Sequence, residues 1–252
     1  MADPSLPHHL PKRRPGNKPG DPAETWPRQR VGTTPQMIGR YPDYDVLSVA
    51  DTWDEATRKV VLARLDPPGP LRFFSAREEP TVRAFCDLVT DQHAEPRVPV
   101  VSAIDAKLAD GRLDGFQYAD MPDDRDTWHL VLAGLEHTAQ QRHGRAFAHC
   151  APGAQEAIVD GFSQGDLDGG PWEQLNVSRA WSVVLRAVLE GFYSHPWSWN
   201  EIGFGGPAYP RGYMRLGPTS TLEPWEKPGA GNEDPAPVAQ QIEQRRRADE
   251  GR

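Results

Sequence analysis

The chain has 252 residues, a formal net charge of −8 at pH 7 and two cysteines. The negative charge argues against nucleic acid as a main partner, because the basic clusters at residues 12–14 and 245–247 lie near the ends of the chain. Two cysteines are too few for a disulfide scaffold, and whether Cys86 and Cys150 pair stays open. No apolar run approaches the roughly 18 to 20 residues that span a bilayer, so we expect no membrane insertion.

Three parts of the chain differ in composition. Residues 1–43 are rich in proline, and residues 217–252 mix proline, glycine and charged side chains. Neither end holds enough apolar surface to offset the entropy lost on ordering, so both are predicted to be disordered. Residues 44–216 are long enough to bury one sizeable core, and we predict a single domain there.

Start signals and apolar spacing predict consecutive helices in this domain. Capping boxes, in which a Ser or Thr precedes a Glu by three positions, open the first two at Thr52 and Ser75. Proline at the start and glycine at the end delimit several of the later ones. In chain order the expected helices cover about residues 52–66, 75–89, 98–111, 122–144, 151–165 and 171–193.

Signals for strands are nearly absent. No β-branched alternation lies between paired turns, and no Asn-Gly or Asp-Gly hairpin joins two such runs. The predicted fold is therefore all-α, a single domain of five or six helices. An irregular arm (residues 191–213), rich in aromatic residues, glycine and proline, follows the last helix.

The arm is the stretch that we expect to bind a partner. Exposed aromatic side chains are costly, so such a segment either covers its own core or presses against another protein, and both interpretations stand. For His195 the alternatives are proton handling at a partner's site and a structural role at the helix end, while Asn200 is expected to bond the turn backbone. The candidate interface residues are Phe192, Tyr193, His195, Trp197, Trp199, Asn200, Phe204, Tyr209 and Tyr213.

Signatures of catalysis are scarce. There is no Gly-x-Gly-x-x-Gly after a strand, no P-loop and no Cys-x-x-Cys, so we expect no catalytic residue, cofactor or metal in this chain. The strongest chemical candidates are His129, Glu136 and His143, which recur every seven residues along one helix face. Residues seven apart lie about 10 Å apart along the axis, too far to share one ion. A polar surface is the preferred interpretation, and a self-contained metal-dependent oxidoreductase is the alternative.

Two stretches of the sequence resemble a known family. Residues 191–207 read Gly-Phe-Tyr-Ser-His-Pro-Trp-Ser-Trp-Asn-Glu-Ile-Gly-Phe-Gly-Gly-Pro. They are similar to a closing pattern in which a helix ends in Phe-Tyr-x-x-Pro and an Ile-Gly-Phe-x-Gly segment follows a turn. Residues 73–78, leading into residues 84–88, are similar to the opening helix of the same family. Over residues 73–213 the chain thus resembles the gluconate 2-dehydrogenase subunit 3 family.

The resemblance implies an accessory role. Members are non-catalytic small subunits of a large flavin-dependent dehydrogenase of the glucose-methanol-choline type, often with a cytochrome c subunit. The partner binds FAD and oxidises sugars, sugar acids or other alcohols. The small subunit stabilises or matures it. A third possibility is a scaffold without a redox partner, binding through its disordered ends.

Two features depart from the family pattern. The Arg13-Arg14 pair is followed by polar, proline-broken sequence rather than an apolar segment, so we expect no export signal. The turn usual after the first family helix is replaced by residues 91–96, Asp-Gln-His-Ala-Glu-Pro. The expected location is the cytoplasm, or outside it if the chain is exported with its partner.

Overall fold

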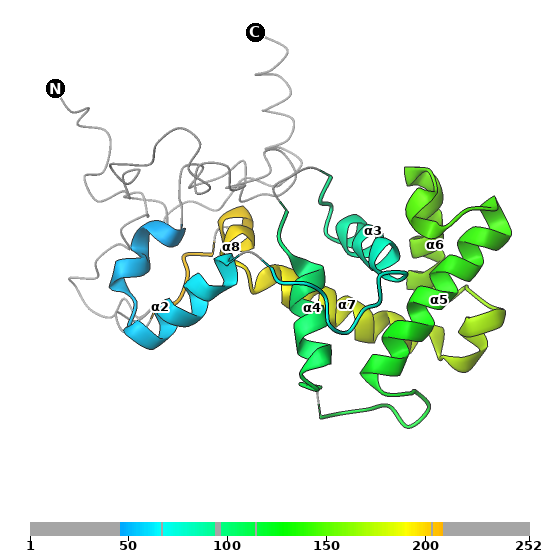
Figure 1. Ribbon diagram of the computed structural model, residues 1–252, viewed down its shortest axis with the longest axis horizontal. Helices are drawn as coiled ribbons and strands as arrows, with labels where there is room; N and C mark the ends of the chain where they lie inside the picture. The colour runs from blue at the N-terminus through cyan, green and yellow to red at the C-terminus, as the bar shows by residue number, and fades with distance from the viewer. Residues whose placement is uncertain (1–45, 67, 94–96, 114, 203, 209–252) are drawn as a thin grey trace, which may run out of the picture. The chain divides into compact units, whose positions relative to one another are not determined.

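Figure 1 shows the computed structural model, which describes residues 46–66, 68–93, 97–113, 115–202 and 204–208. Within these ranges all regular structure is helical and no strand occurs, which confirms the all-α prediction. The ends for which we expect disorder lie outside the described residues, as do Tyr209 and Tyr213. The domain boundaries predicted near residues 43 and 216 also lie outside them and stay a prediction.

The chain divides into two compact units. One, here the terminal unit, consists of residues 1–66 and 193–252, and the other, the central unit, of residues 67–192. The described helices of the terminal unit are η1 (Val46–Thr52), α2 (Glu55–Leu62), η2 (Ala63–Leu65) and α8 (Pro196–Ile202). Those of the central unit are α3 (Glu79–Val89), α4 (Val100–Ala109), α5 (Asp124–His143), η3 (Phe147–His149), α6 (Pro152–Gln164), η4 (Gly170–Gln174) and α7 (Val177–Tyr193), whose last residue counts with the terminal unit.

Several helix starts differ from the prediction, and α3 begins at Glu79, four residues after Ser75. Asp54, and not Thr52, caps α2, because its side chain accepts hydrogen bonds from the amides of Ala56 and Thr57 at 3.0 and 3.1 Å. The stretch expected as one helix over residues 171–193 is split into η4 and α7. The side chain of Asn176 accepts a hydrogen bond from the amide of Arg179 at 3.2 Å and so caps α7.

The arm is less irregular than predicted, because Pro196–Ile202 form helix α8. Proline fits the first position of a helix, since it has no amide hydrogen to donate there. Gly205 and Gly206 follow this helix and do not interrupt it. Composition alone therefore failed to predict the helix within the arm.

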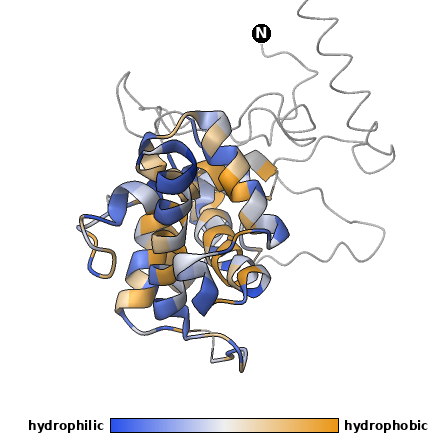
Figure 2. Ribbon diagram, turned by 90° about the vertical axis from the view of Figure 1, so that its right-hand side faces the viewer, coloured by the Kyte–Doolittle hydropathy of each residue, from blue (hydrophilic) through white to orange (hydrophobic). Residues whose placement is uncertain are grey.

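Aromatic side chains form the core of the central unit. Phe85, Trp128, Phe162 and Trp172 are each at most 1% exposed. The rings of Phe162 and Trp172 lie 5.0 Å apart, and those of Phe85 and Phe162 lie 6.2 Å apart. Figure 2 shows hydrophobic and hydrophilic residues alternating along the helices, as expected of helices that bury one face.

A buried carboxylate positions the loop before α3. Asp105 on α4 is 2% exposed and accepts hydrogen bonds from the amides of Arg72, Phe73 and Phe74 at 2.7, 2.9 and 2.9 Å. A buried carboxylate needs such donors, because burying an unpaired charge is costly. These bonds fix the backbone that leads into Ser75 and Glu78.

Candidate functional site

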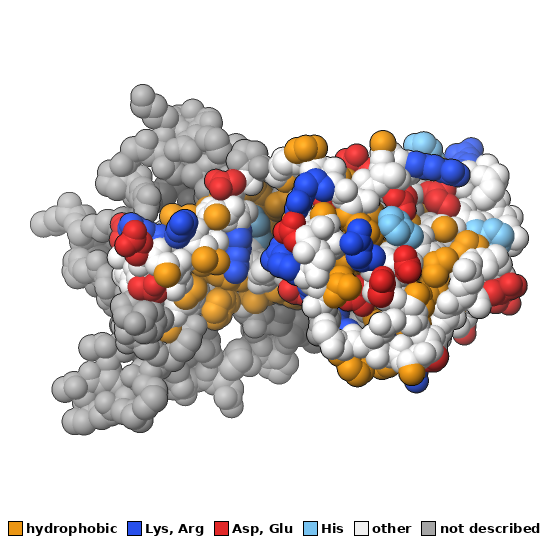
Figure 3. Space-filling view, turned by 60° about the horizontal axis from the view of Figure 1, so that its bottom comes forward, with side chains coloured by type: hydrophobic (Ala, Val, Ile, Leu, Met, Phe, Trp, Pro, Cys, Tyr) orange, Lys and Arg blue, Asp and Glu red, His pale blue; other side chains and the backbone are white. Residues whose placement is uncertain are grey.

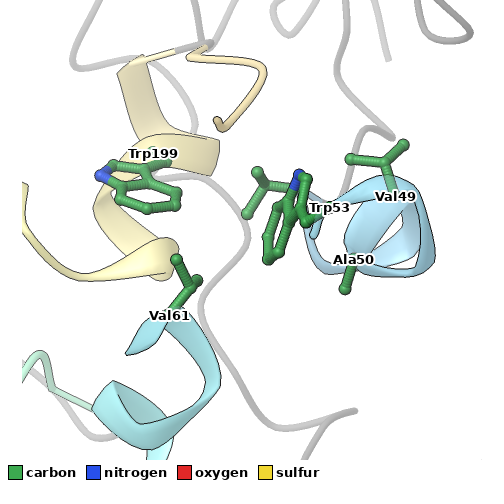
Figure 4. Close-up of a cluster of buried hydrophobic side chains, with 6 residues drawn as sticks. Val49, Ala50, Trp53, Val61 and Trp199 are labelled. Atoms are coloured by element: carbon green, nitrogen blue, oxygen red, sulfur yellow. The ribbon is translucent and has the colours of Figure 1, made fainter. Parts of the chain in front are cut away.

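The first part of the arm packs inside the terminal unit. Trp199 is 7% exposed and belongs to a cluster of buried apolar side chains from η1, the turn after it, α2 and α8 (Figure 4). Its indole nitrogen donates to the carbonyl oxygen of Tyr193 at 2.6 Å. Packing on the core, one of the two interpretations open for the arm aromatics, is thus what the structure shows for this tryptophan. The cluster consists of Val46, Val49, Ala50, Trp53, Val61 and Trp199.

Two further contacts hold the arm against η1. Asn200 is 3% exposed, and its side-chain oxygen accepts a hydrogen bond from the amide of Val46 at 2.8 Å. This bond joins residues 154 positions apart, in addition to any local turn contact expected of Asn200. Gly206 has φ = 82°, and a Cβ there would lie 2.6 Å from Cγ2 of Val46. Glycine is therefore required at this position for the arm to lie so close to η1.

His195 is a buried structural residue of the terminal unit. It is 4% exposed, and its Nδ1 accepts a hydrogen bond from the amide of Trp197 at 3.2 Å. Burial lowers its pKa to about 4, with a further contribution from the charge of Arg64, although a hydrogen bond with the Arg64 backbone opposes this. The ring is therefore neutral at pH 7, and the charged form expected near a helix end is not favoured here.

Of the predicted interface residues that the structure describes, two reach the surface and five are buried. Tyr193 is 45% exposed and Phe204 is 37% exposed, and Phe204 packs edge-on against Trp199 with ring centroids 5.3 Å apart. Val60 and Leu62 on α2 are also exposed, at 56% and 38%; the sequence placed them among the apolar residues of the first predicted helix but not among the interface residues. Their position on an amphipathic helix was the available signal. The buried members of the predicted set are Phe192, His195, Trp197, Trp199 and Asn200.

A polar groove of about 670 Å³ opens on the central unit. It lies where the start of α3, the middle of α5 and η4 come together. Figure 3 shows imidazole, acidic and basic side chains intermingled on the part of the surface that is coloured. The groove is lined by Ser75, Arg77, Glu78, Thr81, His129, Leu132, Ala133, Glu136, His137, Gln140 and Pro171.

Glu78 is held at one side of the groove by the predicted capping box. Its Oε2 accepts hydrogen bonds from the amide and hydroxyl of Ser75 at 2.9 and 2.7 Å, and its Oε1 lies 2.5 Å from Nδ1 of His129. Burial alone would raise the pKa of Glu78, but the hydrogen bonds from Ser75 and His129 outweigh it and lower the pKa. The carboxylate is therefore ionised at pH 7, and Nδ1 of His129 is the donor.

Glu136 lies at the other side of the groove. Its Oε1 accepts a hydrogen bond from the hydroxyl of Thr81, and its Oε2 from the amide of Phe147 at 3.3 Å. The structure thus brings Glu136 and His129 to one groove, together with Glu78. His143, the third member of the sequence pattern, is exposed at the end of α5 and does not line it.

The metal alternative finds no ligand set among the described residues. In these ranges no three His, Cys, Asp or Glu side chains are grouped so as to hold a metal ion. Both cysteines are free and buried, and burial raises the pKa of each thiol. A raised pKa disfavours the reactive thiolate, so neither is suited to act as a nucleophile.

A serine motif also occurs that the sequence reasoning missed. Residues 161–165 read Gly-Phe-Ser-Gln-Gly, the Gly-x-Ser-x-Gly pattern of hydrolases. That chemistry needs the serine on a sharp turn between a strand and a helix. Ser163 lies instead within α6, and its hydroxyl donates to the carbonyl of Asp160 at 2.8 Å. The pattern is therefore part of a helix and not a nucleophile elbow.

The model of the gluconate 2-dehydrogenase subunit 3 family matches residues 76–206, just over half of the chain. The chain belongs to this family, whose description is that of a subunit of a dehydrogenase complex.

Two further comparisons add little about function. A human protein, the uncharacterized LINC02906, is 28% identical over 76 residues, which cover 30% of this chain and 70% of the human one. No solved structure matches the chain. Among the described residues, no helix combines the length and apolar character needed to cross a membrane.

Proposed function

We propose that this chain is a non-catalytic small subunit that binds a FAD-containing dehydrogenase of the glucose-methanol-choline type and stabilises or matures it. The observation that carries the proposal is the family match, which runs from the loop before α3 to Gly206 in the arm. The partner holds the flavin and oxidises sugars, sugar acids or other alcohols. A cytochrome c subunit completes the complex in those systems that contain one.

The terminal unit supplies the surface that we assign to this partner. Tyr193 and Phe204 expose aromatic rings on a segment that is otherwise tightly packed, and aromatic side chains on a rigid support make good interface anchors. Val60 and Leu62 on α2 add exposed apolar area in the same unit. The buried arm residues contribute by holding the segment in one conformation.

The test is affinity capture of the flavoprotein with a double variant, Tyr193→Ala with Phe204→Ala. We expect the affinity to fall by about tenfold or more, because interface anchors of this kind dominate binding energy. The matched control is Phe116→Ala, an exposed ring (60%) of the central unit, which should leave binding unchanged. Equal capture of the flavoprotein by the double variant and the wild type would show that this surface of the terminal unit does not bind the partner.

A further inference from the structure

A buried polar cluster joins the arm to η2 within the terminal unit. The guanidinium of Arg64, in η2, donates to the carbonyl oxygen of Ser194 at 2.6 Å. His195 is 4% exposed, and its Nδ1 accepts from the amide of Trp197 at 3.2 Å. The ring also bonds to the Arg64 backbone, and since this bond raises the His195 pKa, the ring donates and the backbone carbonyl oxygen accepts. Both nitrogens of the neutral ring are therefore bonded, Nδ1 as acceptor and Nε2 as donor.

A proton on Nδ1 of His195 reverses this arrangement. The nitrogen changes from acceptor to donor and then faces the amide hydrogen of Trp197, so two donors oppose each other. The added charge also lies beside the half-buried side chain of Arg64, whose guanidinium is 5.8 Å from the ring centre of Trp199. Among the described residues, Arg64 is the charged side chain that acts on His195, and no carboxylate there compensates the new charge.

The neighbouring contacts hold the two exposed aromatic rings of the arm. The indole of Trp199 donates to the carbonyl oxygen of Tyr193 at 2.6 Å, and the ring of Phe204 packs edge-on against Trp199. The amide of Phe204 in turn donates to the carbonyl oxygen of Trp199 at 2.9 Å. His195 lies between Tyr193 and Trp199 in the chain. A rearrangement at His195 therefore disturbs the support of both exposed rings.

We propose that His195 is an acid-sensitive switch in the terminal unit: protonation at Nδ1 separates the arm from η2 and disrupts the aromatic surface formed by Tyr193 and Phe204. Release of the flavoprotein at acidic pH is the expected consequence. That consequence rests on the proposed function, whereas the opening of the arm does not. The closed form is the neutral one, and proton uptake drives the change.

The pH range of the switch follows from the burial of the ring. Burial, with a smaller contribution from the charge of Arg64, lowers the pKa of His195 to about 4 while the arm is closed, against the ordinary value of 6.5. The open form therefore binds the proton first as the pH falls. The ratio of open to closed arm should rise about tenfold for each pH unit below 6.5 and level off near pH 4, about 300-fold in all.

Hydrogen exchange on the full chain tests the opening of the arm without any partner. Protection factors are measured at pH 7 and pH 5, and each is corrected for the intrinsic exchange rate with an unfolded reference. In the wild type they should fall by about 20-fold over residues 196–202, while the amides of α5 keep their protection. Ordinary carboxylates titrate below about pH 5, so a loss above this pH indicates an imidazole. Unchanged protection of the arm between pH 7 and pH 5 would overturn the inference.

The variant His195→Gln removes the titration and can keep both hydrogen bonds. Its amide oxygen can accept from Trp197, and its amide nitrogen can donate to the Arg64 carbonyl. Its arm should lose less than about threefold in protection between pH 7 and pH 5. His143→Gln, at the exposed end of α5, is the matched control and should lose arm protection as the wild type does. An equal loss in His195→Gln and the wild type would overturn the inference. Should His195→Gln not fold at pH 7, the pH at which the wild-type arm loses protection decides alone.

Capture of the flavoprotein at pH 7 and pH 5 separates this inference from the proposed function. Titration of the flavoprotein itself affects both chains alike, so the comparison is between the wild type and His195→Gln. If the wild type loses about tenfold more affinity than the variant over this range, both stand. Equal losses would mean that the arm does not control release, and only the proposed function stands. If the wild type captures no flavoprotein at pH 7, the proposed function fails and the release of this partner fails with it, while hydrogen exchange still decides whether the arm opens.

Discussion

Gly134 on α5 packs so closely against Trp172 that there is no room for a side-chain methyl group at this position. A Cβ at this position would lie 2.5 Å from Cε2 of Trp172, whose ring is 1% exposed and donates from Nε1 to the hydroxyl of Thr138 at 2.9 Å. Because both sides of this contact are buried, neither can move freely. We expect Gly134→Ala to lower the free energy of unfolding by about 1–3 kcal/mol, measured by urea denaturation.

Gly153 offers a control for this substitution. It also lies in a helix, α6, but nothing is within 4 Å of a Cβ built there. Alanine has the higher helix propensity, so Gly153→Ala should leave the stability unchanged or raise it by up to about 1 kcal/mol. Equal effects of the two substitutions would show that the approach of α5 to Trp172 is not as close as described.

His195 makes the stability of the terminal unit depend on pH, and the direction of this dependence follows from its pKa. Its pKa is about 4 in the folded state against the ordinary value of 6.5, and Arg64 is the charged group beside it. The unfolded chain therefore binds more protons than the folded one between these values. Stability falls as the pH drops from 6.5 to 4, by at most about 3 kcal/mol, and stays low below that.

The variant His195→Gln tests this assignment. Glutamine has an oxygen that can accept from the amide of Trp197, but it does not titrate. We expect the loss of stability between pH 7 and pH 4.5 to be smaller in the variant, measured as the chemical denaturation midpoint of the arm region. The same slope in both proteins would mean that another group controls the acid response.

At the scale of elements, Asp105 connects α4 to the loop that enters α3. It accepts from three consecutive backbone amides, whereas Asp110, at the end of α4, pairs with the exposed side chain of Arg72. We expect Asp105→Asn to cost about 2 kcal/mol, because the amide group turns a donor toward a backbone donor. Asp110→Asn should stay within about 0.5 kcal/mol. Thermal unfolding of the two variants compares them, and a similar small loss in both would contradict the account.

The positions of most helices could be predicted from apolar spacing, but their exact starts could not. Side-chain caps decide a start, and Asp54 and Asn176 were in the sequence without being distinguished from neighbouring candidates. Helix α8 was missed because proline and glycine in the arm were taken as breakers. In fact Pro196 begins a helix, and Gly205 and Gly206 come after its end, so the order of these residues matters more than their number.

At the scale of the whole molecule, the polar groove shows the limit of reasoning from one sequence. Helical spacing placed His129 and Glu136 on one face of α5. Their partners Glu78 and Thr81 come from α3 and the residue before it, 51 and 55 positions away in the chain. Such contacts depend on how helices pack against each other, which no local pattern encodes. The family resemblance, by contrast, was carried by contiguous residues and is confirmed over residues 76–206.

The burial of Trp197 and Trp199 changes what their removal should do. At 9% and 7% exposed they belong to the interior of the terminal unit, so the double substitution to Ala removes core volume, at about 3–5 kcal/mol for each ring. We expect residues 46–66 and 193–208 to lose protection in hydrogen exchange while the central unit keeps it. Intact protection together with lost partner binding would instead make these tryptophans interface anchors.

The central claim is that this chain works as the small subunit of a flavoprotein complex. The most direct measurement is affinity purification of the full chain from its native host, followed by mass spectrometry and an absorption spectrum of the eluate. We expect a large dehydrogenase subunit in stoichiometric amount, with the absorption of a bound flavin. A colourless chain that elutes alone would contradict the account.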